Sequence, residues 1–248
     1  MLTLQRLLGA AVLAVRIIPV MLCRGRSLVK GKHFVNDRVV GHVLQAARTH
    51  AARGVDELMI LDIAATAEGR GPDLEMIREL TADIFTPVTV GGGVRTLQQI
   101  DELLRVGADK VLIGAAAWEI GSTLVREATS HFGSQAVVVP IDYHSKAYWT
   151  AERMAQETQA MGAGEILLNN VDRDGTMSGY DLDLIAEVCK AVSVPVIACG
   201  GCSGYPDMLA AINAGASAVA AGALFQFEDA TPLGAAQWLG QHGITVRL

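Results

Sequence analysis

Glycine pairs at two places in this sequence have the spacing of phosphate-binding turns. Each pair follows a short apolar run, and the next apolar run ends in a second pair of small residues. Turns without side chains let backbone N–H groups approach an anion, and a helix N-terminus behind them adds its dipole. A single turn of this kind is equally consistent with a tight connection, but two matching sets favour a substrate with a phosphate at each end. The residues are Gly92, Gly93, Gly114 and Ala115 in the first set, and Gly200, Gly201, Ala221 and Gly222 in the second.

Four aspartates lie at or just beyond the ends of apolar runs: Asp62, Asp142, Asp172 and Asp174. At the C-terminal ends of parallel strands, carboxylates commonly contact substrates or transfer protons. The same residues also cap helices and hold loops, and for Asp172 the two roles are equally favoured. Asp174 precedes Gly175, so we expect this segment to contact the second phosphate through its backbone. His144 and Lys146 follow Asp142 closely in the sequence. They are either substrate contacts or solvated loop residues.

Four charged residues stand at the starts of apolar runs: Arg16, Glu57, Lys110 and Glu165. Two are positive and two negative, so they can balance each other where they converge at the opposite end of a barrel. The residues alone are consistent with a salt-bridge ring that closes the base, or with a functional opening.

The chain contains eight apolar runs of strand length. Each run is followed by a polar or glycine-rich loop and then by a segment whose apolar residues have the periodicity of a helix. Uniformly apolar strands are typical of a parallel sheet covered on both faces. A length of 248 residues suits one (β/α)₈ barrel, so we predict a single domain over residues 15–248 after an extension of residues 1–14. The predicted strands are Ile17–Leu22, Leu58–Leu61, Val88–Val90, Val111–Ile113, Ala136–Ile141, Ile166–Leu168, Val196–Ala198 and Ala218–Ala221.

The sequence repeats with an offset of 108 residues. Pro87-Val-Thr-Val-Gly-Gly-Gly93 matches Pro195-Val-Ile-Ala-Cys-Gly-Gly201, and Asp73-Leu74 matches Asp181-Leu182. A repeat of this length is too long for a solenoid. It predicts two four-stranded half-barrels related by a pseudo-twofold axis.

Composition excludes several classes of protein. The net charge of −6 and the scattered Lys and Arg residues argue against nucleic-acid binding. The apolar stretch Leu7–Val15 is too short, before Arg16, for a membrane span, and a secretory signal is the less favoured interpretation. Cys199 and Cys202 have C-x-x-C spacing, but no second ligand pair accompanies them, so we expect no metal or cofactor. These features favour a cytoplasmic protein with reduced thiols.

Three segments resemble the cyclase subunit of imidazole glycerol phosphate synthase, and the resemblance runs from Arg16 to Leu248. They are Phe132-Gly-Ser-Gln-Ala-Val-Val-Val, Gly162-Ala-Gly-Glu-Ile-Leu-Leu168 and the highly specific Asp172-Arg-Asp-Gly-Thr-Met-Ser-Gly-Tyr-Asp181. The resemblance implies an ammonia-using phosphate-binding barrel of histidine biosynthesis, paired with a glutaminase subunit at its N-terminal face. It also implies that the four basal charges form the ammonia gate, and that Asp109 faces the partner.

The chain departs from that family at one catalytic position. Two aspartates at the tops of the first and fifth strands perform the family's acid–base chemistry; Asp142 matches one, and Leu22 occupies the other position. Leucine cannot transfer a proton, and strand alternation turns the neighbouring Cys23 to the other face. Lys30 still matches the family's basic loop residue, whereas the loop after Asp142 is shorter than usual.

The resemblance and the departure leave several functions open. The favoured one is an ammonia-channelling synthase subunit, which resembles a diverged branch that supplies ammonia for amidino groups on polysaccharide sugars through a third protein, a sugar amidotransferase. The alternatives are a true histidine-biosynthesis cyclase, a single-chain sugar-phosphate isomerase without ammonia, and a non-catalytic ammonia conduit.

Overall fold

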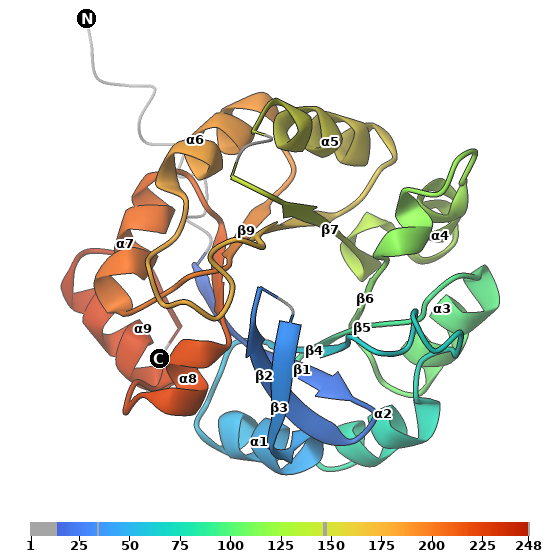
Figure 1. Cartoon of the computed structure of the whole chain (residues 1–248), viewed down its shortest axis with the longest axis horizontal. Coiled ribbons are helices and arrows are strands. Elements are labelled where there is room, and N and C mark those ends of the chain that lie inside the picture. Colours follow the sequence, from blue (N-terminus) through green and yellow to red (C-terminus); the bar gives the residue numbers. More distant parts are fainter. Residues whose placement is uncertain (1–13, 34, 146–147, 248) are drawn as a thin grey trace, which may run out of the picture.

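Eight parallel strands close into a barrel in the computed structural model, which describes residues 14–33, 35–145 and 148–247. Hydrogen bonds connect the strands in the order β10-β9-β8-β7-β6-β5-β4-β1, and β10 pairs with β1 to complete the ring (Figure 1). The predicted (β/α)₈ barrel is confirmed. The barrel strands are β1 (Arg16–Arg24), β4 (Leu58–Asp62), β5 (Val88–Gly91), β6 (Lys110–Leu112), β7 (Val137–Tyr143), β8 (Glu165–Asn170), β9 (Val196–Cys199) and β10 (Ala218–Ala221).

Helices surround the barrel on the outside (Figure 1). Several begin at a side chain that accepts a hydrogen bond from the first helical turn, as Asp73, Thr96, Asp181 and Thr231 do. The helices are α1 (Val43–Ala52), α2 (Leu74–Thr81), α3 (Leu97–Arg105), α4 (Leu124–Phe132), α5 (Tyr148–Ala160), α6 (Leu182–Ala191), α7 (Tyr205–Asn213), α8 (Ala223–Phe227) and α9 (Pro232–Gln241), with short 3₁₀ turns at Ala115–Ala117 and Ser134–Ala136.

Alternate residues of each strand supply two separate layers of core. On β1, Ile18, Val20 and Leu22 face the barrel interior. Met21 and Cys23 instead pack outward among residues of the helices. The alternation expected at Leu22 and Cys23 is therefore confirmed, and it decides which of the two lines the functional end of the barrel.

The two halves repeat in backbone detail as well as in sequence. Gly107 and Gly215 have φ values of +108° and +113°, and a Cβ at either position would lie 2.6 Å from Thr81 Oγ1 or 2.9 Å from Cys189 Cβ, respectively. Asp73 and Asp181 cap the equivalent helices α2 and α6. These pairs are all separated by 108 positions, so the pseudo-twofold relation of the half-barrels extends to their turns and caps.

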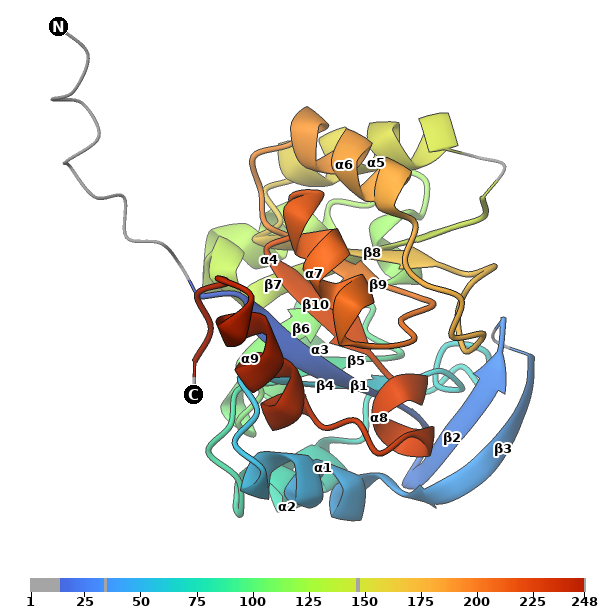
Figure 2. The ribbon, with the colours of Figure 1, turned by 90° about the vertical axis from the view of Figure 1, so that its left-hand side faces the viewer.

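An antiparallel hairpin that the sequence analysis treated as a loop follows β1. Strands β2 (Ser27–Lys32) and β3 (Val35–His42) pair with each other, and β2 also pairs with the end of β1. The hairpin projects from the C-terminal end of the barrel strands, opposite the end where the chain's C-terminus lies (Figure 2). It places Lys30 beside the barrel mouth. Both strands mix charged with apolar residues, so neither contains an apolar run from which a strand could be predicted.

Candidate functional site

One cavity occupies the barrel mouth, at the C-terminal ends of the strands. All eight residues of the two glycine-rich sets line this cavity, and so do Lys30, Asp62, Asp142, Asp174 and Gly175. The sequence-predicted site residues are thus largely brought together. Asp172 is the exception among the predicted substrate residues, because it is not part of the cavity lining in the described chain.

Close backbone packing requires glycine at both turns. Gly92 and Gly200 have φ values of +112° and +88°, and a Cβ on Gly200 would lie 2.6 Å from the carbonyl oxygen of Asn170. A Cβ on Gly92 would overlap the equivalent carbonyl oxygen of Asp62. Each turn is therefore wedged against the preceding strand end. The same lack of side chains leaves backbone N–H groups open to an anion, which is the property that phosphate binding needs.

Lys30 places a buried positive charge beside the second glycine set. Its side chain is 4% exposed, and Nζ lies 3.5 Å from Asp174 Oδ1. A Cβ on Gly222 would lie 3.3 Å from Lys30 Nζ, so the ammonium group stands directly over this glycine. The long distance to Asp174 leaves capacity for a second anionic partner at the glycine turn. A phosphate group has the charge and the oxygen atoms to fill that place.

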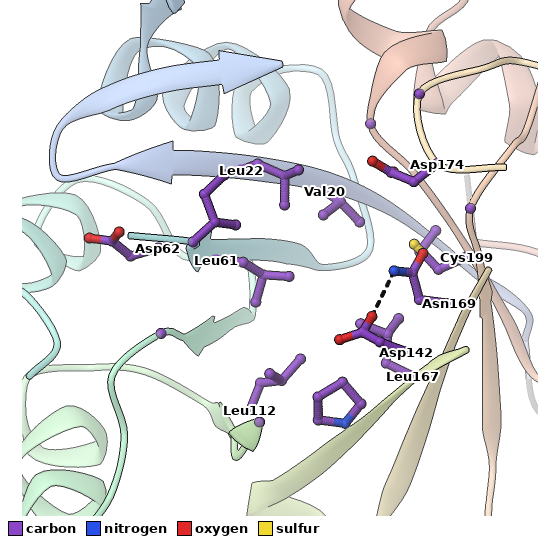
Figure 3. A pocket seen from close by; sticks show the side chains of 18 of the residues that line it. Val20, Leu22, Leu61, Asp62, Leu112, Asp142, Leu167, Asn169, Asp174 and Cys199 are labelled. Carbon is purple, nitrogen blue, oxygen red and sulfur yellow. Dashed lines mark hydrogen bonds between the residues drawn. The ribbon is translucent and has the colours of Figure 1, made fainter. Parts of the chain in front are cut away.

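Asp142 stands at the mouth end of β7, next to Asn169 on β8 (Figure 3). Asn169 Nδ2 donates to Asp142 Oδ1 at 2.8 Å. The protein around Asp142 raises the pKa of its carboxyl group by desolvation, and the negative charge of Asp174 acts in the same direction, whereas the Asn169 hydrogen bond opposes the change. A carboxyl group with a raised pKa is suited to proton transfer nearer to neutral pH. Asp142 thus lines the cavity with a carboxyl group whose properties suit the proton transfer predicted from the sequence.

The opposite wall of the cavity is apolar. Val20, Leu22, Leu61 and Leu112 supply it, and Leu22 is 7% exposed (Figure 3). Cys23 cannot replace the missing acid, because its thiol packs outward and burial raises its pKa to about 12. Among the described residues at this wall, no second carboxylate faces Asp142 as the family pattern requires.

Two of the predicted aspartates are held by other protein groups. Asp62 binds Arg70 through both oxygens, at 2.7 and 3.0 Å, and accepts hydrogen bonds from the backbone of Gly25, Ala64 and Ala65. In Figure 3 its carboxylate points away from the centre of the cavity. These contacts fix the loop after β4 and leave Asp62 at the rim.

Asp172 connects two loops at the mouth. It accepts from the Ser145 backbone at 2.7 Å and lies 2.7 Å from His144 Nδ1. These hydrogen bonds lower the pKa of the Asp172 carboxyl group. His144 is 69% exposed, and its contact with Asp172 ties the loop after β7 to the loop after β8. Lys146 lies outside the described residues.

Several further lining residues were not predicted from the sequence as part of the site, among them Arg95, Asn169 and Cys199. Arg95 lies beside the first glycine set and is paired with Glu119 only at 3.8 Å. Asn169 on β8 lies between Asp142 on β7 and Cys199 on β9. Arg95 lies two residues after the Gly92-Gly93 turn, and this closeness is a signal that could have identified it. The thiols of Cys199 and Cys202 are buried, which raises their pKa values to about 12 and about 11. Both therefore remain protonated near neutral pH.

The four basal charges form a closed ring of ion pairs. Arg16 contacts Glu57 at 2.6 Å and Glu165 at 2.9 Å, and Lys110 contacts the same two carboxylates at 2.8 and 3.1 Å. Burial opposes the charge on Glu57, but Lys110 and Arg16 outweigh it and lower its pKa. Arg16, Lys110 and Glu165 begin β1, β6 and β8, and Glu57 directly precedes β4, so the ring lies at the N-terminal end of the barrel. Asp109 beside it is exposed and accepts a hydrogen bond from the Val88 backbone.

The described part of the chain lacks two other kinds of feature. No group of three or more His, Cys, Asp or Glu side chains in this part of the chain is arranged to hold a metal ion. Within the same residues, no helix has both the length and the apolar character needed to cross a bilayer.

The fold and the mouth define a (β/α)₈ barrel with a carboxylate beside its two glycine sets. Residues 16–231 match the family model described as "Histidine biosynthesis protein". The chain belongs to this family. Similar proteins include the imidazole glycerol phosphate synthase subunits HisF of Dictyoglomus thermophilum (38% identical, covering 95% of this chain and 99% of the relative), Thermobifida fusca (41%, 88% and 93%) and Streptomyces coelicolor (41%, 88% and 92%).

Proposed function

We propose that this chain is the ammonia-receiving synthase subunit of an imidazole glycerol phosphate synthase-type glutamine amidotransferase. Its base binds a glutaminase, and its mouth binds a substrate with a phosphate at each end. Support comes from the relatives named as synthase subunits and from the two glycine sets that face one cavity. The ring of Arg16, Glu57, Lys110 and Glu165 lies where ammonia would enter from the glutaminase.

We further propose that the chain has diverged from the cyclisation reaction itself. The observation that carries this proposal is Leu22, which gives the wall opposite Asp142 no proton-transfer group. Such a barrel would pass ammonia onward, and a sugar amidotransferase that forms amidino groups is the proposed acceptor. The second candidate is a cyclase that functions in histidine biosynthesis, which the identity of 38–41% to synthase subunits supports.

Reconstitution with a glutaminase tests the proposed partnership. We expect the chain to form a stable complex with a glutaminase subunit and to stimulate glutamine hydrolysis, and Asp109→Lys to weaken the complex. Absence of binding to glutaminases from the same genome would contradict the proposal and favour a single-chain isomerase. Turnover of the bisphosphorylated ribulosyl-imidazole substrate with ammonium salts then separates the candidates: full turnover by the natural chain would establish the cyclase.

A further inference from the structure

Among the described residues, the lysine and arginine side chains that line the barrel mouth are Lys30 and Arg95, and they lie at different glycine sets. Lys30 stands over Gly222 of the second set, is 4% exposed, and has Asp174 as its ion-pair partner. Arg95 lies two residues after the turn of the first set, and its side chain is 51% exposed. Each set therefore has one cation, but the cation of the first set is open to solvent.

The half-barrel repeat does not account for this pair of cations. The position 108 residues after Arg95 is Ser203, whose backbone N–H and hydroxyl both donate to Asp207, at 2.8 and 2.6 Å. Lys30 comes from the hairpin of β2 and β3 rather than from a glycine turn. The two glycine sets thus repeat in their backbone, while their charged side chains come from different elements. A ligand with two similar ends would be held differently at each of them.

The start of α3 fixes the backbone of Arg95. Gln99 Oε1 accepts hydrogen bonds from the backbone N–H groups of Arg95, at 2.8 Å, and Thr96, at 3.2 Å. Thr96 Oγ1 accepts in return from the Gln99 backbone, which completes a capping box. The base of the Arg95 side chain therefore has a defined place beside the first glycine turn, and only side-chain torsions need to change when a ligand binds.

The guanidinium group of Arg95 is held loosely. Its Nη1 lies 3.8 Å from Glu119 Oε1, which is too long for a hydrogen bond, and Glu119 is itself 59% exposed. An exposed ion pair of this kind contributes little to stability. An anion at the first glycine turn can therefore replace Glu119 as the partner of Arg95 at small cost.

The rest of the wall near the first glycine set supplies no other cation among the described residues. Leu61 and Leu112, at the ends of the two strands that flank β5, line this part of the cavity, and so does Val94. Arg70 is bound by Asp62 and does not belong to the lining. A multiply charged anion needs positive charge in addition to backbone N–H groups. At the first glycine set, the group that can supply it is the guanidinium of Arg95.

We propose that Arg95 is the specificity-determining residue for the ligand end that binds at the first glycine set, and that it selects a phosphate group there. Two N–H groups of the planar guanidinium donate to two phosphate oxygens, and Glu119 is released. The inference rests on the proposed function for the presence of an anion at this end of the ligand. It makes the two ends unequal, because Lys30 binds one of them within the protein and Arg95 binds the other at the solvent-exposed rim.

An NMR titration of the isolated chain with inorganic phosphate, at an ionic strength held constant with sodium chloride, tests this role. The reporters are the backbone amides of Gly93 in the first set and Gly222 in the second, and we expect saturable shifts of both. In Arg95→Gln, the affinity reported by Gly93 should fall by at least about tenfold, because charge-assisted hydrogen bonds are lost, while that reported by Gly222 stays the same. Arg95→Lys keeps the charge without the paired donors, so an intermediate affinity is expected.

Two further variants separate ligand binding from a structural role. Glu119→Gln removes the competing carboxylate, and we expect it to raise the affinity reported by Gly93 by about twofold. A purely structural Arg95 would give no such gain. The matched control is Arg105→Gln on α3, which removes an arginine that is 76% exposed and should leave both reporters unchanged.

Several outcomes would overturn the proposal. They are an unchanged Gly93 response in Arg95→Gln, an equal loss at Gly93 and Gly222 in that variant, and no response of Gly93 in the natural chain. Equal shifts with chloride alone would show an adventitious ion only. Absence of a Gly222 response in the natural chain would instead contradict phosphate binding at the second set in the proposed function. Because the titration uses no glutaminase, failure of the proposed partnership leaves its result intact.

Discussion

Leu22 on β1 and Leu61 on β4 are paired in parallel register, and both side chains border the mouth of the barrel across from Asp142. The position at which the family resemblance expects an aspartate is thus part of an apolar wall. Because the backbone register there is that of a regular barrel strand, an aspartate at position 22 would face the same cavity as Leu22 does. Leucine at position 22 therefore changes the chemistry of one side chain and not the geometry of the site.

Leu22→Asp is therefore expected to increase ammonia-dependent cyclisation of the bisphosphorylated substrate. General acid–base catalysis typically contributes about 10²–10⁴-fold to a rate, and we expect a gain of at least about tenfold over the natural chain. The measurement is substrate turnover with ammonium salts. Leu61→Asp is the control, since it adds the same charge to the same wall at a position without this role. An equal gain in both variants, or full activity in the natural chain, would contradict the prediction.

The sequence predicted those parts of the molecule that depend on local pattern. Apolar runs identified all eight barrel strands, and the repeated glycines identified the cavity because closely approaching strand ends exclude side chains. The hairpin of β2 and β3 was missed because its strands mix charged and apolar residues. Asn169 was missed for a different reason. Its position beside Asp142 follows from the register of β7 and β8, which joins residues 27 positions apart.

The contacts of Asp62 and Asp172 could not be predicted in the same way. Asp62 is engaged by Arg70, and Asp172 is engaged by His144. Each partner comes from a loop whose course depends on the whole mouth of the barrel. A carboxylate at a strand end is a general signal, and the structure distinguishes those that line the cavity from those that hold loops.

Gly201→Ala is expected to destabilise the fold strongly. Gly201 has φ of +97°, and a Cβ there would overlap the Gly179 carbonyl oxygen and lie 2.9 Å from Arg173 Cβ. We expect the free energy of unfolding to fall by more than about 2 kcal/mol, because backbone strain and a collision combine. Gly243→Ala is the control, with φ of +83° and nothing within 4 Å, so it reports strain alone. Urea denaturation measures both, and equal losses would show that the close packing at Gly201 is unimportant.

Lys110→Met is expected to leave two carboxylates at the barrel base with only Arg16 to neutralise them. Glu57 is 3% exposed and Glu165 13%, so we expect the free energy of unfolding at pH 7 to fall by about 2–4 kcal/mol. The lowered pKa of Glu57 means that its stabilising contribution is present above about pH 4.5 and is lost as the pH falls through its folded-state value. The difference between the variant and the natural chain should therefore shrink in acid.

The control for this variant is Arg105→Met, which breaks the exposed ion pair with Asp101 on α3. Arg105 is 76% exposed, and we expect no measurable change in stability or in its pH dependence. Chemical denaturation of both variants at pH 7 and below pH 4.5 makes the comparison. A loss at Lys110 that does not depend on pH would assign the effect to packing of the lysine stem rather than to the ion-pair ring.

His50 should make the stability of the barrel sensitive to mild acid. It lies buried on α1, in edge-to-face contact with Phe225 of α8 at 6.4 Å, and its Nδ1 has no partner among the described residues. Burial lowers the pKa of His50, and Arg53 adds to the effect. Since the unfolded chain binds a proton near pH 6.5 and the folded chain does not, stability falls by up to about 1.4 kcal/mol per pH unit below that value, until the folded-state pKa is reached.

In His50→Leu the decline between pH 7 and pH 5 should be shallower, whereas His131→Gln, at an exposed position on α4, should leave it unchanged. Urea denaturation across this pH range measures the slopes, and parallel curves for His50→Leu and the natural chain would show that another group controls the response.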